Sequence, residues 1–488
     1  MLELKKYEFW FVTGSQPLYG PEVIDQVAEH SKKIVEGLNE KNLPYEIILK
    51  NVVTDSNSIR KVCNEANNSE NCAGIITWMH TFSPAKMWIH GLTELRKPLL
   101  HLHTQFNKEI PWGTIDMDFM NLNQSAHGDR EFGYIGARLD IPRKIVVGHW
   151  TEDSVARDIS KWMAPAVAFT EGKNIKVARF GDNMRDVAVT DGDRIEAEIK
   201  FGWTVDYYGV GDLVEAMEKV TEGQIDELMS IYSNLYDIAP NADVNSIREQ
   251  ARIEIGLKTF LDNGGYTAFT TNFQALHGMK QLPGLAVQHL MSEGYGFGAE
   301  GDWKTAALLR AMKIMAQGKG TGLMEDYTYN LDSDNGLILG AHMLEVCPTL
   351  AGTKPVIEVH PLGIGGKEDP ARLVFKGASG PAVAASLIDL GNRFRLIVNS
   401  VDAVEMKKDM PNLPVASVLW KPQPSLKEGA KAWILAGGAH HTSFSFALNE
   451  EQLQDFADMS QIECVVINND TKLSTFKNEL KLSNAAWK

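Results

Sequence analysis

The sequence predicts an α/β protein in which two doubly wound parallel-sheet domains are followed by a mainly β C-terminal domain. Short apolar runs alternate with helical periodicity over about the first 320 residues, which is typical of βαβ units. Farther along, short segments separated by Gly, Pro and Asp turns predominate, which is typical of β structure. The 488 residues also exceed the roughly 250 to 300 at which a single core stops growing. We therefore expect domains at 1–174, 175–325 and 326–488.

The first domain is expected to alternate strand and helix regularly. A helix is expected to start near Pro21, because Val27, Ile34 and Leu38 recur close to helical spacing. Further helices are expected over 58–66 and 85–95. Strands are expected at residues 9–13, 45–49, 73–78, 98–104 and 144–148. This alternation predicts a parallel sheet with helices on both of its faces.

The other two domains are expected to differ in secondary structure. In the central domain we expect a strand at 175–179 and helices over 246–263, 283–294 and 305–315. In the C-terminal domain we expect short extended segments at 337–346, 356–359, 382–388, 393–400, 416–420 and 432–436.

Composition narrows the class of function. With 48 basic and 63 acidic residues, the net charge of −15 argues against a nucleic-acid or anionic-membrane surface and favours a small-molecule ligand. The four cysteines form no C-x-x-C pair, which favours reduced thiols. The N-terminus resembles no signal peptide, and no window of about 20 apolar residues would span a bilayer. A cytoplasmic enzyme with no membrane partner is expected.

A glycine-rich loop at residues 294–308 carries one acidic side chain. Gly296, Gly298 and Gly301 match the G-x-G-x-x-G spacing of dinucleotide-binding loops. The context argues against that function, because a helix over 283–294 rather than a strand is expected before the loop. Glu300 would also repel a diphosphate. We therefore expect a loop that presents Glu300 to a cation.

Further acids and histidines are candidate metal ligands. They are Glu325 with Asp326, His342, Glu358 with His360, and the pair His440 and His441. Carboxylates together with imidazoles suit Mn²⁺ or Co²⁺ better than Mg²⁺, Ca²⁺ or Zn²⁺. Competing interpretations are a helix-dipole partner for Glu300 and a hydrogen-bonded core histidine for His342. In an extended chain His440 and His441 would point to opposite faces, so only one should reach a given metal.

Two other pairs are weaker candidates. Glu358 and His360 share one face of an expected strand and could chelate a metal. His101 and His103 resemble the H-x-H of metal-dependent hydrolases, but the β-rich last third of the chain breaks the eight-fold βα pattern that such a barrel requires. His101 and His103 are instead expected to end a parallel strand that borders a cleft.

Several long segments together resemble the L-arabinose isomerase family. The matching blocks cover residues 14–20, 125–133, 294–308, 324–329, 342–348 and 437–442. Their order and spacing agree with the family over essentially the whole chain. The resemblance implies an aldose-ketose isomerase that interconverts L-arabinose and L-ribulose, with conversion of D-galactose to D-tagatose as a side activity.

The resemblance also implies roles for particular residues. It implies one Mn²⁺ per subunit, with Co²⁺ as the alternative, held by Glu300, Glu325, His342 and His441. Glu300, Glu325 and His440 are the implied catalytic residues. With this resemblance, the glycines of the 294–308 loop are expected to let the backbone approach a metal-bound sugar. The implied sugar contacts are Gln16, Leu18, Tyr19, Gln124, His127, Met184, Phe273 and Ile364. Family members are homo-oligomers, so a homohexamer or homotetramer with sites between subunits is expected.

A mechanism follows from these assignments as a hypothesis. The ion would polarise the carbonyl of the open-chain sugar, while one glutamate moves a proton between C2 and C1 and the other handles the hydroxyl proton. His127 or His440 would assist ring opening. Two other classes compete: an NAD-dependent sugar dehydrogenase, which requires bound nicotinamide, and a non-catalytic sugar-binding protein of periplasmic type, which requires an export signal.

Overall fold

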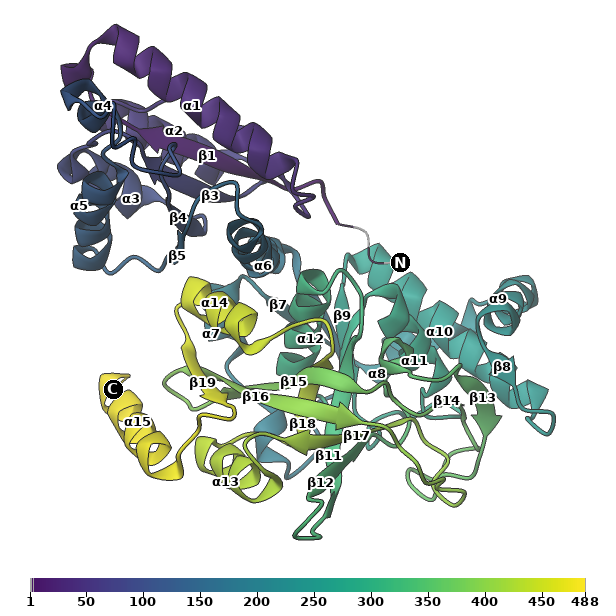
Figure 1. The fold of residues 1–488 in the computed structure, drawn as a ribbon. Coiled ribbons are helices and arrows are strands. Elements are labelled where there is room, and N and C mark those ends of the chain that lie inside the picture. Colours follow the sequence, from purple (N-terminus) through teal and green to yellow (C-terminus); the bar gives the residue numbers. More distant parts are fainter. Residues whose placement is uncertain (1, 3, 488) are drawn as a thin grey trace. The chain divides into compact units, whose positions relative to one another are not determined.

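The computed structural model describes residues 2 and 4–487 (Figure 1). The chain forms two compact units, one of which is Leu4–Thr170 while the other comprises the chain from Glu171 onward. Among the described residues no helix combines the length and apolar character needed to cross a membrane. The four cysteines are free thiols, as expected.

The Leu4–Thr170 unit is built on a five-stranded parallel sheet in the order β2-β1-β3-β4-β5 (Figure 1). The strands are β1 (Glu8–Gly14), β2 (Glu46–Leu49), β3 (Cys72–Met79), β4 (Leu99–His103) and β5 (Lys144–Val147). The helices are η1 (Pro17–Tyr19), α1 (Pro21–Asn39), α2 (Ser56–Asn68), η2 (Ala85–Trp88), α3 (Ile89–Glu94), α4 (Met117–Leu122), α5 (Ser125–Arg138) and α6 (Asp153–Glu171). Every residue of β3 is buried, as is usual for a central strand covered on both faces.

The central region holds a four-stranded parallel sheet in the order β10-β9-β6-β7. Its strands are β6 (Lys176–Phe180), β7 (Thr204–Tyr208), β9 (Ala268–Thr271) and β10 (Gly296–Gly298). Its helices are η3 (Gly172–Asn174), η4 (Ala188–Thr190), α7 (Arg194–Phe201), α8 (Val210–Glu218), α9 (Glu222–Leu235), α10 (Val244–Gly264), α11 (Leu285–Glu293) and α12 (Trp303–Met315).

Helix α12 joins the central region to the C-terminal one. All thirteen of its residues are buried, including Lys304, Arg310 and Lys313. It packs against β9 and β10 of the parallel sheet and also against β11 (Thr321–Asn330), β15 (Gly380–Asp389) and β18 (His441–Ser445) (Figure 1). A helix enclosed by two sheets has no solvent-facing side, so the residues at its start are fixed from several directions.

The C-terminal strands close into a barrel. Their order is β15-β18-β11-β12-β17-β16, and β16 pairs back with β15, so six antiparallel strands form a ring to which β19 adds in parallel. The remaining strands of this sheet are β12 (Leu337–Ala341), β16 (Phe394–Val404), β17 (Ser417–Pro422) and β19 (Glu463–Ile467). A ring leaves no unpaired edges between its members.

A small sheet, three α-helices and one 3-10 helix complete the C-terminal region. The sheet has the order β14-β13-β8, with β8 (Asp237–Ile238), β13 (Val356–Val359) and β14 (Ala371–Val374). The helical elements are η5 (Pro348–Leu350), α13 (Leu426–Ala436), α14 (Glu450–Ser460) and α15 (Leu473–Ala486).

The predicted fold class is confirmed, because parallel sheets with flanking helices precede a sheet-rich C-terminal region. Two expected strands are wrong in detail. Residues 432–436 belong to α13, which Ser425 caps at its start and Gly437 ends in a left-handed conformation. The strand expected over 337–346 ends at Ala341. The domain boundaries at 174 and 325 stay a prediction.

Candidate metal and active site

Glu300 stands in the short loop between β10 and α12 in an uncommon backbone conformation. Its φ of 59° lies in the left-handed region, which residues other than glycine rarely adopt. The loop is held by two hydrogen bonds: Gly301 N–H donates to Thr271 O at 3.1 Å, and Met184 N–H donates to Glu300 O at 2.9 Å. Such conformations cost about 1 to 3 kcal/mol and cluster at functional sites, where the surroundings enforce them.

Two glycines of this loop allow close packing in the fold. A Cβ on Gly296 would lie 2.1 Å from the carbonyl oxygen of Ala306, and one on Gly298 would lie 2.1 Å from that of Asp302. Both glycines therefore let β10 lie directly against the start of α12. This short strand was not predicted from the sequence. The expectation that the loop backbone approaches a metal-bound sugar stays a prediction.

Glu325 and His342 come from the barrel. Glu325 lies in β11 and is paired with His441 of β18 on one side and with Ala341 of β12 on the other. His342 directly follows β12, and its Nε2 lies 3.9 Å from Glu325 Oε2. The side chain of His342 is almost fully buried, so it faces the protein interior rather than solvent.

His440 and His441 both reach Glu300. Glu300 Oε2 lies 3.4 Å from His440 Nε2 and 3.9 Å from His441 Nε2. Both histidines lie on the Glu300 side because β18 begins at His441 and His440 precedes the strand. That only one of them would bind a given metal stays a prediction. The alternation of side chains applies only inside a strand.

The four predicted ligands approach one another as two pairs, Glu325 with His342 and Glu300 with His441. Among the described residues, Glu300 and His441 form a tighter group with His440, in which the possible ligand atoms all lie within 4.8 Å of one another. Two ligand atoms that each lie about 2.1 Å from one metal are at most roughly 4.2 Å apart, and both 3.9 Å separations satisfy this limit. The rings of His342 and His441, one from each pair, have centroids 5.8 Å apart. That all four residues bind one ion stays a prediction. His441 Nε2 is also buried without a hydrogen-bond partner among the described residues, which is costly unless a cation occupies it.

Two further carboxylates orient the histidines. His342 Nδ1 donates to Glu345 Oε2 at 2.5 Å, and His441 Nδ1 donates to Asp302 Oδ2 at 3.3 Å. Metal-binding histidines commonly donate their other ring N–H to a carboxylate in this way. Asp302 and Glu345 were not predicted from the sequence, although each lies within three residues of a predicted ligand.

The charges of the cluster favour ionised acids. The hydrogen bond from His440 lowers the pKa of Glu300 despite the opposing effect of burial. The same bond raises the pKa of His440. For His342 burial acts to lower the pKa, but the charge and hydrogen bond of Glu345 outweigh it and raise the pKa to about 9. Carboxylates kept ionised beside imidazoles can hold a cation.

A narrow cavity adjoins the cluster. Phe273, Leu276 and Leu362 line it together with Glu300 and His342. Two of the predicted sugar contacts in this region, Phe273 and Met184, therefore lie at the site, Met184 through its bond to the Glu300 backbone. Ile364 is 41% exposed and follows the lining residue Leu362 by two positions.

Comparison with known proteins identifies the family. Models of the N-terminal, central and C-terminal domains of L-arabinose isomerase match residues 3–174, 176–318 and 320–463. The chain belongs to the L-arabinose isomerase family. It is 85% identical to the L-arabinose isomerase of Clostridium beijerinckii and 67% identical to that of Geobacillus stearothermophilus, with complete coverage of both chains in each case. It is therefore an isomerase, as the sequence predicted.

A third relative extends the comparison. The L-arabinose isomerase of Bacillus subtilis is 61% identical over all of this chain and 99% of its own. Agreement of this extent places arabinose isomerisation ahead of the dehydrogenase and sugar-binding alternatives.

The first predicted sugar contacts of this family member lie just after β1. Gln16 precedes η1, and its Nε2 donates to the hydroxyl of Tyr19 at 3.4 Å. Leu18 is 80% exposed. The hydroxyls of Ser15 and Thr81 bond at 2.6 Å and so join this loop to the segment after β3. These residues therefore lie at the carboxyl edge of the parallel sheet, where α/β proteins bind ligands.

The second group of predicted sugar contacts begins α5 at the same edge. Gln124 N–H donates to His80 O at 2.9 Å, directly beyond β3. His127 stacks on Phe82 with ring centroids 4.7 Å apart. The structure brings Gln16, Tyr19, Gln124 and His127 to one edge of the sheet in the Leu4–Thr170 unit.

The residues of the two weaker candidate sites are hydrogen-bonded within their own groups. His101 Nε2 and His103 Nδ1 bond the two oxygens of Asp129 at 2.7 and 2.6 Å. His101 Nδ1 is buried without a partner, so a metal on Nε2 would leave a buried N–H unpaired. This group is better described as a hydrogen-bonded clamp than as a metal site. Glu358 and His360 bond each other at 2.6 Å.

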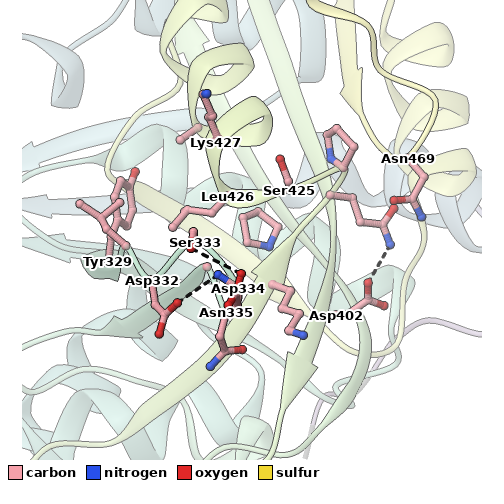
Figure 2. A pocket seen from close by; sticks show the side chains of 17 residues that line it. Tyr329, Asp332, Ser333, Asp334, Asn335, Asp402, Ser425, Leu426, Lys427 and Asn469 are labelled. Atoms are coloured by element: carbon pink, nitrogen blue, oxygen red, sulfur yellow. Dashed lines mark hydrogen bonds between the residues drawn. The ribbon is translucent and has the colours of Figure 1, made fainter.

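A larger open pocket lies elsewhere in the barrel. It has a volume of about 760 Å³ and is lined by the loop between β11 and β12 and by the start of α13. Figure 2 shows Tyr329, Asp332 and Asn335 from the hairpin, with Ser425 and Lys427 from the segment that begins α13. None of the four predicted metal ligands lines this pocket in the described part of the chain, so its size does not make it the active site.

Proposed function

We propose that the protein interconverts L-arabinose and L-ribulose at the Glu300, Glu325, His342 and His441 cluster, with D-galactose to D-tagatose as a side activity. One observation carries the proposal: two carboxylates from different elements meet two buried histidines, and one of these, His441, has a buried Nε2 without a hydrogen-bond partner in the region described. Family membership supplies the substrate.

The cluster is proposed to hold one Mn²⁺ per subunit, with Co²⁺ as the alternative. Two carboxylates and two imidazoles suit these ions better than Mg²⁺, which prefers oxygen ligands alone. When bound, the ion would polarise the sugar carbonyl and offset the negative charge of the enediolate.

The proton transfers are assigned to side chains of this cluster. One of Glu300 and Glu325 takes the proton from C2 and returns it to C1, while the other moves the hydroxyl proton. The two acids come from different elements, so their environments differ, as such a division of roles requires. His440 lies beside Glu300 and its side chain is partly exposed. It is therefore assigned to assist ring opening, by proton transfer at the ring oxygen of the sugar.

The remaining proposed sugar contacts fall in two groups. Met184, Phe273 and Ile364 belong to the same unit as the metal ligands, and Phe273 lines the cavity at Glu300. Gln16, Leu18, Tyr19, Gln124 and His127 belong to the Leu4–Thr170 unit. In the second group the polar side chains of Gln16, Tyr19, Gln124 and His127 would bind sugar hydroxyls, whereas the apolar side chains of the first group would shape the cavity.

The proposal includes a cytoplasmic homo-oligomer, a hexamer or a tetramer. Trp112 is 82% exposed and Met117 is 65% exposed, and both lie between β4 and α5. Large exposed apolar side chains at one segment support an interface with another copy. Light scattering of the purified chain measures the subunit number, and a monomer would contradict this part of the proposal.

The deciding experiment follows the reaction in D₂O. Protein stripped with a chelator receives Mn²⁺ and L-arabinose without NAD, and NMR follows the ketose. We expect ketose only after Mn²⁺ is added, with solvent deuterium entering the product when the abstracted proton exchanges. No ketose would overturn the isomerase proposal, whereas ketose at full rate in the presence of chelator would overturn its metal dependence.

A further inference from the structure

Asp302 lies where three parts of the structure meet. It is the N-cap of α12: its Oδ1 accepts the backbone N–H of Thr305 at 3.1 Å, and its Oδ2 accepts the Thr305 hydroxyl at 2.8 Å. The same Oδ2 lies 3.3 Å from His441 Nδ1. The side chain is 2% exposed, so these contacts are made away from water.

The bond to Asp302 determines which nitrogen of His441 is free. A carboxylate accepts but does not donate when ionised, so His441 carries its proton on Nδ1 and keeps a lone pair on Nε2. That Nε2 is buried, lies 3.9 Å from Glu300 Oε2 and has no hydrogen-bond partner in the described residues. The lone pair is therefore directed at the cluster rather than at a protein donor.

Asp302 also balances a buried cation. Lys304 has a side chain that is 1% exposed, and its Nζ lies 3.5 Å from Asp302 Oδ1. The ammonium donates to Val189 O at 2.9 Å and to Asp191 O at 2.6 Å. An uncompensated buried charge would be costly, so Asp302 stabilises the position of Lys304 and, through it, the segment around Val189.

The segment that Lys304 binds also contacts the backbone of Glu300. It includes Met184, whose N–H donates to Glu300 O at 2.9 Å. One carboxylate therefore fixes the start of α12, the orientation of His441 and, through Lys304, the segment that supports the Glu300 loop. We propose that Asp302 is a positioning residue that sets the divalent-cation affinity of the site by holding the His441 and Glu300 ligands in place.

This inference rests on the proposed metal site, and its test measures cation binding without turnover. Full-length protein stripped with a chelator is titrated with Mn²⁺ by calorimetry. Asp302→Asn keeps the shape but removes the charge, and we expect its affinity to fall by roughly 10- to 100-fold, the usual effect of losing such a partner. Asp243→Asn is the matched control, because Asp243 caps α10 through Asn245 N–H and bonds no histidine in the part of the chain described.

A second variant guards against misfolding. Asp302→Asn leaves Lys304 without its counter-ion, so Asp302→Asn combined with Lys304→Met removes both buried charges together. We expect this folded double variant also to bind Mn²⁺ at least about tenfold more weakly than the parent. Parent-like affinity in either folded variant, or an equal loss in Asp243→Asn, would overturn the proposal.

The tautomer of His441 supplies a readout that needs no metal. In apo protein labelled with ¹⁵N-histidine, long-range ¹H–¹⁵N spectra should show His441 protonated at Nδ1 in the parent and redistributed in Asp302→Asn, while His101 is unchanged. A proton on His441 Nε2 in the parent would overturn the positioning role. If the parent shows the expected tautomer but binds no Mn²⁺, the proposed metal site fails and the cation-affinity claim fails with it.

Discussion

Glu325 of β11 and His441 of β18 lie directly opposite each other in an antiparallel strand pair. Side chains opposite each other in such a pair share one face, with Cβ atoms about 4.5 to 5.5 Å apart. The strand register therefore brings an acid and an imidazole together although their positions differ by 116 in the sequence. A slip of one residue would turn either side chain to the opposite face.

Glu325→Gln is expected to lower kcat by at least about 100-fold, since a general acid or base contributes roughly 10² to 10⁴. The amide keeps the shape of the side chain but neither takes up a proton nor carries charge toward a cation. Ketose formation at saturating L-arabinose and Mn²⁺ measures the loss, and the metal content of dialysed protein shows whether binding is lost as well.

Asp326→Asn is the matched control for that variant. Asp326 lines a small cavity with Trp420 and Trp433. Burial, and then the charge of Glu325, raise the pKa of Asp326 to about 7, so a neutral side chain is already well populated there at neutral pH. Activity should stay within roughly threefold of the parent. Equal losses in both variants would contradict a specific role for Glu325.

Phe273→Ala is expected to shift preference from L-arabinose toward D-galactose. Phe273 lines the cavity that includes Glu300 and His342, and removing its ring makes room for the additional hydroxymethyl group of galactose. A group of that size changes discrimination by about 1 to 3 kcal/mol. The ratio of kcat/KM for the two sugars measures the shift.

Phe260→Ala separates this effect from general loosening of the core. Phe260 packs in the same hydrophobic core as Phe273, but it does not line the cavity among the described residues. It should lower stability and leave the ratio unchanged. An unchanged ratio in Phe273→Ala would show that the sugar does not use this cavity.

The fold was predictable where local patterns decide it. Helical periodicity places α1, and the alternation of apolar runs with helices identifies the parallel sheets. The prediction fails at residues 432–436, which were expected to form a strand because they are a short apolar segment between turns. Ser425 and Gly437 are the capping residues of a helix there, and these two signals were not used. It also fails beyond Ala341, because the bond from His342 to Glu345 belongs to a turn rather than to a strand.

The candidate site was predictable only as a set of residue types. Glu300 and His441 could be named from the sequence and the family resemblance, but the distance between them depends on how α12 packs against β18. Asp302 and Glu345 gave no comparable signal, since an acid near a glycine or a histidine is most often solvated. Only the folded chain shows that their carboxylates turn back to the rings.

Asp129→Asn is expected to destabilise the protein by about 1 to 3 kcal/mol, because the single amide oxygen cannot accept from both imidazoles. Asp129 is buried and bonds His101 and His103 at 2.7 and 2.6 Å. Urea unfolding of the full chain measures the change. Glu131→Gln, an exposed change on the same helix, should leave the midpoint unchanged, and a similar loss there would contradict the clamp.

The same clamp predicts a pH dependence of stability. The hydrogen bond to Asp129 raises the pKa of His103, although burial opposes the shift. A histidine whose pKa is higher in the folded state than in the unfolded state stabilises the fold when it is protonated. This contribution is complete below the unfolded-state pKa of about 6.5 and is lost as the pH rises through the folded-state pKa. The difference in urea midpoint between the parent and Asp129→Asn should therefore shrink as pH rises above about 6.5. A constant difference would show that His103 titrates normally.

Mn²⁺ is expected to raise the thermal midpoint of chelator-stripped protein. An ion that binds only the folded state adds about 2.7 kcal/mol to the free energy of unfolding when its free concentration is 100 times its dissociation constant. His441→Gln should abolish most of this shift, since His441 provides the buried free Nε2. His360→Gln is the matched control: His360 bonds Glu358 at 2.6 Å and lies outside the cluster. A shift that survives in His441→Gln and disappears in His360→Gln would move the ion to the Glu358 pair.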